Sequence, residues 1–86
     1  MKIELEISEY KKEDGIESYW ENGFEISVTN SNNEIVISAN RQGLISLAIQ
    51  LLSLAQDAAP TGSHFHYDEH NSLENGSPNL IIEKRA

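Results

Sequence analysis

The stretch from Ala39 to Asp57 constrains the fold most, because it is the only part of the chain whose pattern predicts a long helix. Placed at about 100° per residue, its apolar side chains cover roughly twice the arc that a surface helix needs. The central apolar stripe comprises Leu44, Leu47, Ala48, Leu51 and Ala55, widened by Ile45, Ile49, Leu52 and Leu54. The polar sector comprises Gln42, Ser46, Gln50, Ser53, Gln56 and Asp57. We expect the chain's own loops to wrap the flanks of the apolar arc, or part of it to contact a second chain.

Five other segments alternate apolar and polar residues or carry a short apolar run, which is typical of strands. The predicted strands are Lys2–Ser8, Phe24–Thr29, Glu34–Ala39, Ser63–Asp68 and Asn79–Lys84, the last covered on both sides. The Asn-rich run 29–33 predicts the turn of a hairpin. This order, β-β-β-α-β-β, indicates a single α+β domain over residues 1–86. We expect a mostly antiparallel five-stranded sheet with the one long helix packed on one face.

Three residues predict how the helix and a loop are fixed. Asn40 stands where an N-cap belongs, because its side chain can accept from an unpaired helix N–H. Gly43 in the first turn suggests close backbone packing. Leu73 is the only apolar residue in its loop, so we expect it to anchor that loop to the core.

Composition limits the class of partner. The 86 residues contain no cysteine, and fourteen acidic against six basic side chains give a net charge of -8. Such a surface repels nucleic acid and anionic membranes and attracts a basic protein. The opening MKIELEIS has no continuous apolar run, so we expect neither a secretory signal nor a membrane span. We expect a cytoplasmic protein without a cofactor.

The predicted sheet would have one open face. Alternation places the same side of several strands there, and most of the side chains are acidic or imidazole groups. The predicted open face carries Glu4, Glu6, Glu25, Ser27, His64, His66 and Asp68. A rigid face of this kind is suited to docking a basic partner.

All three histidines and two carboxylates lie within the seven residues His64–His70. On a strand, His64, His66 and Asp68 would share one face about 6–7 Å apart, so they are the candidates for a metal site. The other interpretation is recognition, with these side chains solvated on the open face. No cysteine nucleophile and no Gly-rich phosphate loop is present, so we predict no catalytic residue.

The second half of the chain resembles a known family. The residues that carry the resemblance are SANRQGLISLAIQLLSLAQ, the stretch GSHFHYDEHNSLE at Gly62–Glu74, and LIIEK near the end. They resemble an immunity-protein family of bacterial polymorphic toxin systems. The resemblance implies a small α+β protein that binds and neutralises a toxin without catalysis. Its motif positions here are His64, His66, Asp68, Glu69 and Asn71.

The leading hypothesis is therefore an immunity protein whose cognate toxin is basic, for example a nuclease. The predicted partner-binding residues are Glu4, Glu6, His64, His66, Asp68, Glu69, His70 and Asn71. Two alternatives stay open. One is a small metal-binding protein that uses His64, His66 and Asp68. The other is a structural or regulatory module that dimerises through the apolar flank of the helix.

Overall fold

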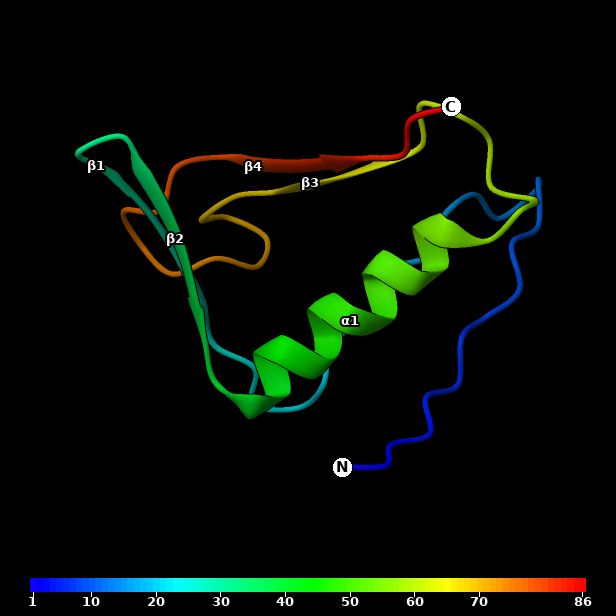
Figure 1. The fold of residues 1–86 in the computed structure, drawn as a ribbon, viewed down its shortest axis with the longest axis horizontal. Helices are drawn as coiled ribbons and strands as arrows, with labels where there is room; N and C mark the ends of the chain where they lie inside the picture. The colour runs from blue at the N-terminus through cyan, green and yellow to red at the C-terminus, as the bar shows by residue number, and fades with distance from the viewer.

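The computed structural model describes residues 1–86 and has the α+β class that the sequence predicts. Its elements are β1 (Ile26–Ser31), β2 (Glu34–Ala39), α1 (Arg41–Ala55), β3 (His64–Tyr67) and β4 (Leu80–Glu83). β1 pairs with β2 and β3 pairs with β4, both antiparallel, and the two hairpins form separate sheets. The prediction of one five-stranded sheet is wrong. Figure 1 shows α1 starting at the lower end of β2 and running away from β1–β2, with β3–β4 along its upper side. α1 is too short to cross a membrane.

The β1–β2 hairpin is the part that the sequence predicts best. Ser31 pairs with Glu34, which leaves Asn32 and Asn33 as a two-residue turn. Both have positive φ, 54° and 61°. A turn of this length needs left-handed residues so that its twist matches the strands, and asparagine adopts that conformation readily.

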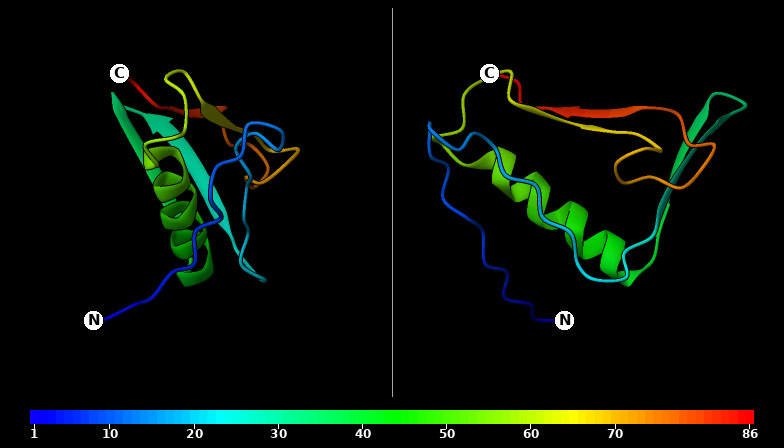
Figure 2. Two further views of the ribbon diagram at one scale, coloured as in Figure 1. Left: turned by 90° about the vertical axis from the view of Figure 1, so that its right-hand side faces the viewer. Right: turned by 180° about the vertical axis from the view of Figure 1, so that it is seen from behind.

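The amino-terminal segment 2–8 is not a strand, although its residues alternate. It runs extended past α1, away from β3–β4 (Figures 1 and 2), and is tied at its far end by one helix side chain. There the Tyr10 N–H donates to Gln56 Oε1 at 2.9 Å, and Gln56 Nε2 donates to the Ser8 carbonyl at 3.1 Å. The prediction of a strand at 2–8 is therefore wrong. Alternation indicates which side chains share a face, but it does not show that another strand lies beside the segment.

The core lies between the two hairpins, where one face of each meets α1. Its buried residues are Ile26, Val28, Leu54, Phe65, Tyr67 and Leu73. Trp20 closes one side, stacked on Phe24 with ring centroids 4.5 Å apart and edge-on to Tyr67 at 5.7 Å. Leu73 is buried, which confirms that it anchors its loop.

β4 is covered on one side only. Ile82 packs against the core, while Ile81 is 59% exposed on the other face. The prediction that this strand is covered on both sides is therefore wrong. A two-stranded ribbon with α1 beneath it has no second layer to cover its outer face.

α1 begins as the sequence predicts. Asn40 Oδ1 accepts from the Gly43 N–H at 2.8 Å and from the Glu25 N–H at 3.0 Å, so one side chain caps the helix and ties it to β1. A Cβ on Gly43 would lie 2.7 Å from the Glu25 carbonyl oxygen and 2.8 Å from Cγ1 of Ile26. The close backbone packing predicted for this glycine is confirmed.

The face that α1 turns inward carries a polar stripe between the buried apolar residues Ile49 and Leu54, whereas the sequence predicts an apolar face. Ser46, Gln50 and Ser53 are buried. Three leucines of the expected apolar core arc are instead about half exposed: Leu44 (56%), Leu51 (47%) and Leu52 (48%). The cause is the connection 16–24, which runs along α1 (Figure 2) and presents backbone polar groups to it. Buried polar groups of this kind must be hydrogen-bonded, so polar helix residues face them.

Three hydrogen bonds satisfy that buried interface. Ser46 Oγ accepts from the Glu21 N–H at 2.8 Å, and Gln50 Nε2 donates to the Tyr19 carbonyl at 2.7 Å. The Tyr67 hydroxyl donates to Gln50 Oε1, also at 2.7 Å. Gln50 therefore joins the connection, the helix and β3 in one buried chain of hydrogen bonds.

Candidate functional site

β3 separates its side chains as predicted. Phe65 and Tyr67 are buried, while His64 and His66 are exposed on the outer face. The register places Glu83 opposite His64 and Ile81 opposite His66, so these cross-strand pairs share that face. The outer face of β3–β4 therefore presents two imidazoles, one carboxylate and one isoleucine.

The acidic residues expected beside these histidines lie elsewhere. Glu4 and Glu6 are exposed on the amino-terminal segment, which runs past α1 away from β3–β4 (Figure 1). Glu25 precedes β1, and Ser27 lies on β1 in the other hairpin. A single open face that joins all seven residues does not exist, because the strands that would form it belong to separate sheets or to none.

Asp68 and Asn71 hold the loop that follows β3. Asp68 Oδ1 accepts from the His70 N–H at 2.8 Å and from the Asn71 N–H at 3.0 Å. Asn71 Oδ1 accepts from the Asp68 N–H, and Asn71 Nδ2 donates to the His66 carbonyl, each at 3.0 Å. The Asp68 carbonyl also accepts from the Leu73 N–H at 2.9 Å. Together these bonds fix the turn that carries Leu73 into the core.

The rest of this loop covers the outer edge of β1. The Glu74 N–H donates to the Ile26 carbonyl at 2.9 Å, and the Val28 N–H donates to Ser77 Oγ at 3.0 Å. Glu69 Oε2 accepts from the Gly76 N–H at 2.8 Å, which holds the loop closed. Side chains predicted as surface ligands thus build a loop that replaces a strand neighbour for β1.

His70 follows Glu69 in this loop and has 86% of its side chain accessible. Its Nε2 lies 3.8 Å from Glu69 Oε1, and His66 Nε2 lies 3.9 Å from Asp68 Oδ2. Both separations exceed hydrogen-bond length, and ion pairs at exposed positions contribute little to stability. The two imidazoles are therefore free to meet a partner.

The proposed metal ligands do not form a site. Nowhere in the chain do three His, Asp or Glu side chains gather in a way that could hold an ion. Asp68 Oδ1 already accepts two backbone N–H groups, and His64 Nδ1 lies 3.1 Å from the Gly62 carbonyl oxygen.

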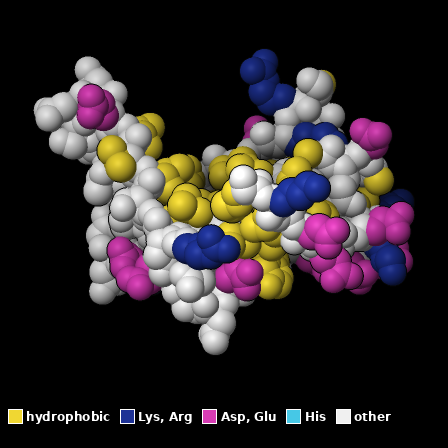
Figure 3. Space-filling model, turned by 60° about the horizontal axis from the view of Figure 1, so that its bottom comes forward, with side chains coloured by type: hydrophobic (Ala, Val, Ile, Leu, Met, Phe, Trp, Pro, Cys, Tyr) yellow, Lys and Arg dark blue, Asp and Glu magenta, His cyan; other side chains and the backbone are white.

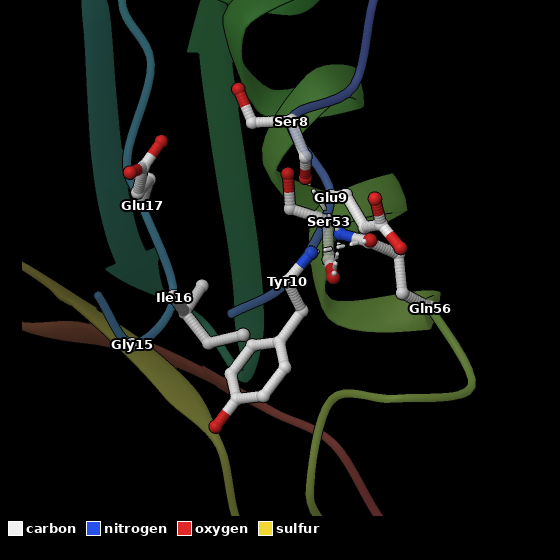
Figure 4. A pocket seen from close by; sticks show the side chains of 8 residues that line it. All are labelled: Ser8, Glu9, Tyr10, Gly15, Ile16, Glu17, Ser53 and Gln56. Carbon is white, nitrogen blue, oxygen red and sulfur yellow. Dashed lines mark hydrogen bonds between the residues drawn. The ribbon is translucent and has the colours of Figure 1, made fainter. Parts of the chain in front are cut away.

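A small pocket lies between the amino-terminal connection and the end of α1 (Figure 4). Its lining residues are Ser8, Glu9, Tyr10, Gly15, Ile16, Glu17, Ser53 and Gln56. Its volume of about 10 Å³ has room for roughly one water molecule and none for an organic substrate. Gln56 spans its wall, because its amide bonds both Ser8 and Tyr10.

Two tyrosines have shifted pKa values. Burial raises the pKa of Tyr67 far above its usual value of 10.0, so its hydroxyl stays protonated and donates to Gln50. The pKa of Tyr19 is raised by its hydrogen bond to Glu21 and by the charge of that carboxylate. Neither group is a proton donor suited to neutral pH.

Sequence reasoning missed the buried roles of Ser46, Gln50 and Ser53. The available signal is their spacing, because positions i, i+4 and i+7 lie on one helix face. A polar stripe at that spacing also fits a solvated face, so the spacing alone does not distinguish the two.

Comparison with known families gives one match. The model of the family described as Immunity protein 32 matches residues 34–85, more than half of the chain. The match begins at β2 and includes α1, β3 and β4. It also includes the loop 68–79 between β3 and β4, which we call the motif loop. Neither the curated proteins nor the solved structures contain a significant match. The family match agrees with the resemblance carried by the helix and the motif, and the chain belongs to the immunity protein 32 family.

Proposed function

We propose that this protein binds a cognate bacterial toxin and neutralises it without catalysing a reaction. The observation that carries the proposal is the family match, which spans the whole second half of the fold.

The partner that suits this surface is a basic protein, such as a nuclease. The net charge of -8 attracts such a protein over a distance and accelerates encounter. Glu4 and Glu6 form an exposed acidic pair on the amino-terminal segment and contribute to this steering. The same net negative charge would repel nucleic acid and anionic membranes.

The docking surface in this proposal is the outer face of β3–β4 with the adjoining loop. His64, His66 and His70 contact the partner there, and Glu69 adds a carboxylate. Asp68 and Asn71 act as positioning residues, because their side chains hold the loop. Exposed imidazoles and a carboxylate on a short hairpin offer both donors and acceptors to a basic surface.

The two roles are separable by mutation. Asn71→Ala removes the bonds to Asp68 and His66 and should lower the free energy of unfolding by about 1–2 kcal/mol. His70→Ala, one residue earlier, removes no side-chain hydrogen bond and should leave stability within about 0.5 kcal/mol. Urea denaturation of both variants checks this, and equal losses would contradict the division of roles.

Capture of the partner tests the function itself. Tagged protein immobilised in lysate of the source bacterium, washed at low and then high salt, should retain a basic protein that is identified by mass spectrometry. The gene of that protein should stop growth when expressed alone and permit growth when expressed with this chain. A captured protein that is harmless by itself would refute the proposal.

Charge reversal tests the steering. Glu4→Lys combined with Glu6→Lys should lower the association rate with the captured toxin, most strongly at low salt. Glu13→Lys combined with Asp14→Lys is the matched control, because it makes the same change of charge at an exposed turn outside the proposed surfaces. An association rate that does not change in the double variant would contradict the electrostatic part of the proposal.

A further inference from the structure

We propose that the free edge of β2 and the outward apolar face of α1 form a two-fold interface with a second copy of this chain. We call this surface the edge–helix face. It consists of Ile35, Val36 and Ile37 on β2 and Leu44, Leu51 and Leu52 on α1. The outer face of β3–β4 is not part of it, so toxin binding and dimerisation use different surfaces.

β2 has backbone groups without a partner. The Asn40 N–H donates to the Glu25 carbonyl at 3.1 Å, which identifies the even-numbered residues as the ones that face β1. In an antiparallel pair the residues alternate, so the N–H and C=O groups of Ile35 and Ile37 point to the other side. The sheet has only the two strands, and that side is open.

The two outer edges of the β1–β2 hairpin differ, because only the edge of β2 is left without hydrogen-bond partners. The outer edge of β1 is closed by Glu74 and Ser77 of the motif loop. β2 has no equivalent cover, and its exposed edge carries none of the prolines or lysines that usually block edge pairing.

The side chains on this edge are apolar on both faces of the sheet. Ile35 is 68% exposed, and Val36 and Ile37 are about as exposed as the outward leucines of α1. Exposure of three consecutive β-branched side chains to water costs free energy, and such residues favour pairing with another strand.

α1 extends the apolar surface from the same side. Figures 1 and 2 place the free edge of β2 and the uncovered side of α1 toward the same side of the molecule. Figure 3 shows hydrophobic side chains gathered between the hairpin and the helix, with acidic and basic groups around them. In the proposed interface, the outward leucines of α1 continue the apolar surface of β2.

A second copy fits this surface by symmetry. Two β2 strands paired antiparallel about a two-fold axis place Ile35 and Ile37 of one copy opposite the same apolar set of the other. The axis is perpendicular to the sheet, so the sheet grows to four strands in the order β1-β2-β2-β1. Both copies of α1 then lie on one face of that sheet, where their exposed leucines can meet.

The local charges favour the same arrangement. Glu34 begins β2 and Arg41 follows its end, so the strand is acidic at one end and basic at the other. Antiparallel pairing brings the acidic end of each strand toward the basic end of its partner. The net charge of -8 on each copy opposes encounter, and salt screens that repulsion. Dimerisation should therefore strengthen with salt, whereas capture of a basic toxin should weaken.

Analytical ultracentrifugation of the purified chain, without any toxin, tests the proposal. At tens of micromolar protein we expect the mass of a dimer, more completely at high than at low salt. Ile37→Lys and Leu51→Lys should each weaken the dimer by about tenfold or more. Ile81→Lys is the matched control, because it adds the same charge at another exposed isoleucine, which is 59% exposed against 43% for Ile37 and lies outside the edge–helix face, and its dimer should persist. Circular dichroism confirms that each variant is folded.

Amide hydrogen exchange of the wild-type chain provides a second measurement. The Ile35 and Ile37 amides should be protected at high protein concentration and lose that protection on dilution. A monomer at every concentration would overturn the proposal, and so would a dimer that Ile81→Lys disrupts as strongly as Ile37→Lys. Protection of both amides in a monomer would also overturn it, because the chain's own segment 2–8 would then cover the edge. None of these outcomes depends on toxin neutralisation.

Discussion

The two sides of α1 differ in where their polar residues lie. The inward side carries a buried, hydrogen-bonded polar stripe of Ser46, Gln50 and Ser53, flanked by the buried apolar residues Ile49 and Leu54. The outward side carries leucines that are about half exposed. Amphipathic helices are usually oriented by the transfer of apolar area from water. Here the backbone groups of the neighbouring connection are also satisfied by Ser46 and Gln50 on the inward side, beside the buried Ile49 and Leu54.

The comparison shows that a helix face is chosen by its neighbour as well as by its own hydrophobicity. A buried amide without a partner costs about 1–3 kcal/mol, comparable to the burial of one leucine. Where an irregular segment packs against a helix, polar helix residues are therefore the stable choice. The apolar side is left outward, available to another molecule.

The largest effect should come from the buried polar side. Gln50→Ala leaves the Tyr67 hydroxyl and the Tyr19 carbonyl without their partner, and each costs about 1–3 kcal/mol. We expect a loss of about 2–4 kcal/mol in the free energy of unfolding, measured in urea. Gln42→Ala, at an exposed position of the same helix, is the control and should change stability by less than about 0.5 kcal/mol. Equal effects would show that Gln50 is solvated.

Close packing on the inward side predicts the next effect. Gly43→Ala raises helix propensity by about 1 kcal/mol, but its Cβ meets the Glu25 carbonyl and Ile26. Overpacking against backbone costs about 1–3 kcal/mol, so we expect a net loss of stability. A thermal melt checks the sign, and a variant more stable than the wild type would contradict the contact with β1.

Tyr67 predicts a dependence on pH that the outward side should not show. Its folded pKa lies above 10.0, so the unfolded chain releases this proton at a lower pH than the folded chain. The contribution to stability is fully present below pH 10.0 and is lost as pH rises above it. Urea denaturation across about pH 9–11 should therefore show a steeper decline for the wild type than for Tyr67→Phe. An equal decline of stability with pH in the two proteins would mean that the Tyr67 hydroxyl is exposed to water.

The smallest effect should come from the outward side. Leu52→Ser removes an apolar side chain that is already 48% exposed, so the unfolding free energy should change by less than about 1 kcal/mol. The measurement requires dilute protein, so that association does not contribute. A loss as large as that of Gln50→Ala would mean that Leu52 is in the core.

Local features of this fold were predictable where one short stretch determines them. β2 has the predicted bounds, Asn40 caps α1, and the Asn-rich turn closes the first hairpin. The failures involve partners distant in sequence. Segment 2–8 alternates like a strand, yet the outer edge of β1 is occupied by Glu74 and Ser77, 48 or more residues along the chain from Ile26 and Val28.

In the candidate site, too, the sequence predicted the local features and not those that depend on distant segments. Alternation along β3 correctly places His64 and His66 on an exposed face. It could not show that Glu4 and Glu6 lie elsewhere, because that depends on how the strands assemble. Nor could it show that Asp68 and Asn71 bond the backbone of their own loop, since an aspartate on a strand and an aspartate that holds a turn have the same sequence signature.

The orientation of α1 is the central claim, and thiol reactivity tests it most directly. The chain has no cysteine, so one introduced thiol reports the accessibility of its own position. Leu51→Cys and Ser53→Cys lie two residues apart on the helix, outward and inward respectively. In dilute folded protein, the thiol of Leu51→Cys should react with a disulfide reagent as fast as a free thiol, and that of Ser53→Cys only on unfolding. Rapid reaction at position 53 and protection at position 51 would contradict the account.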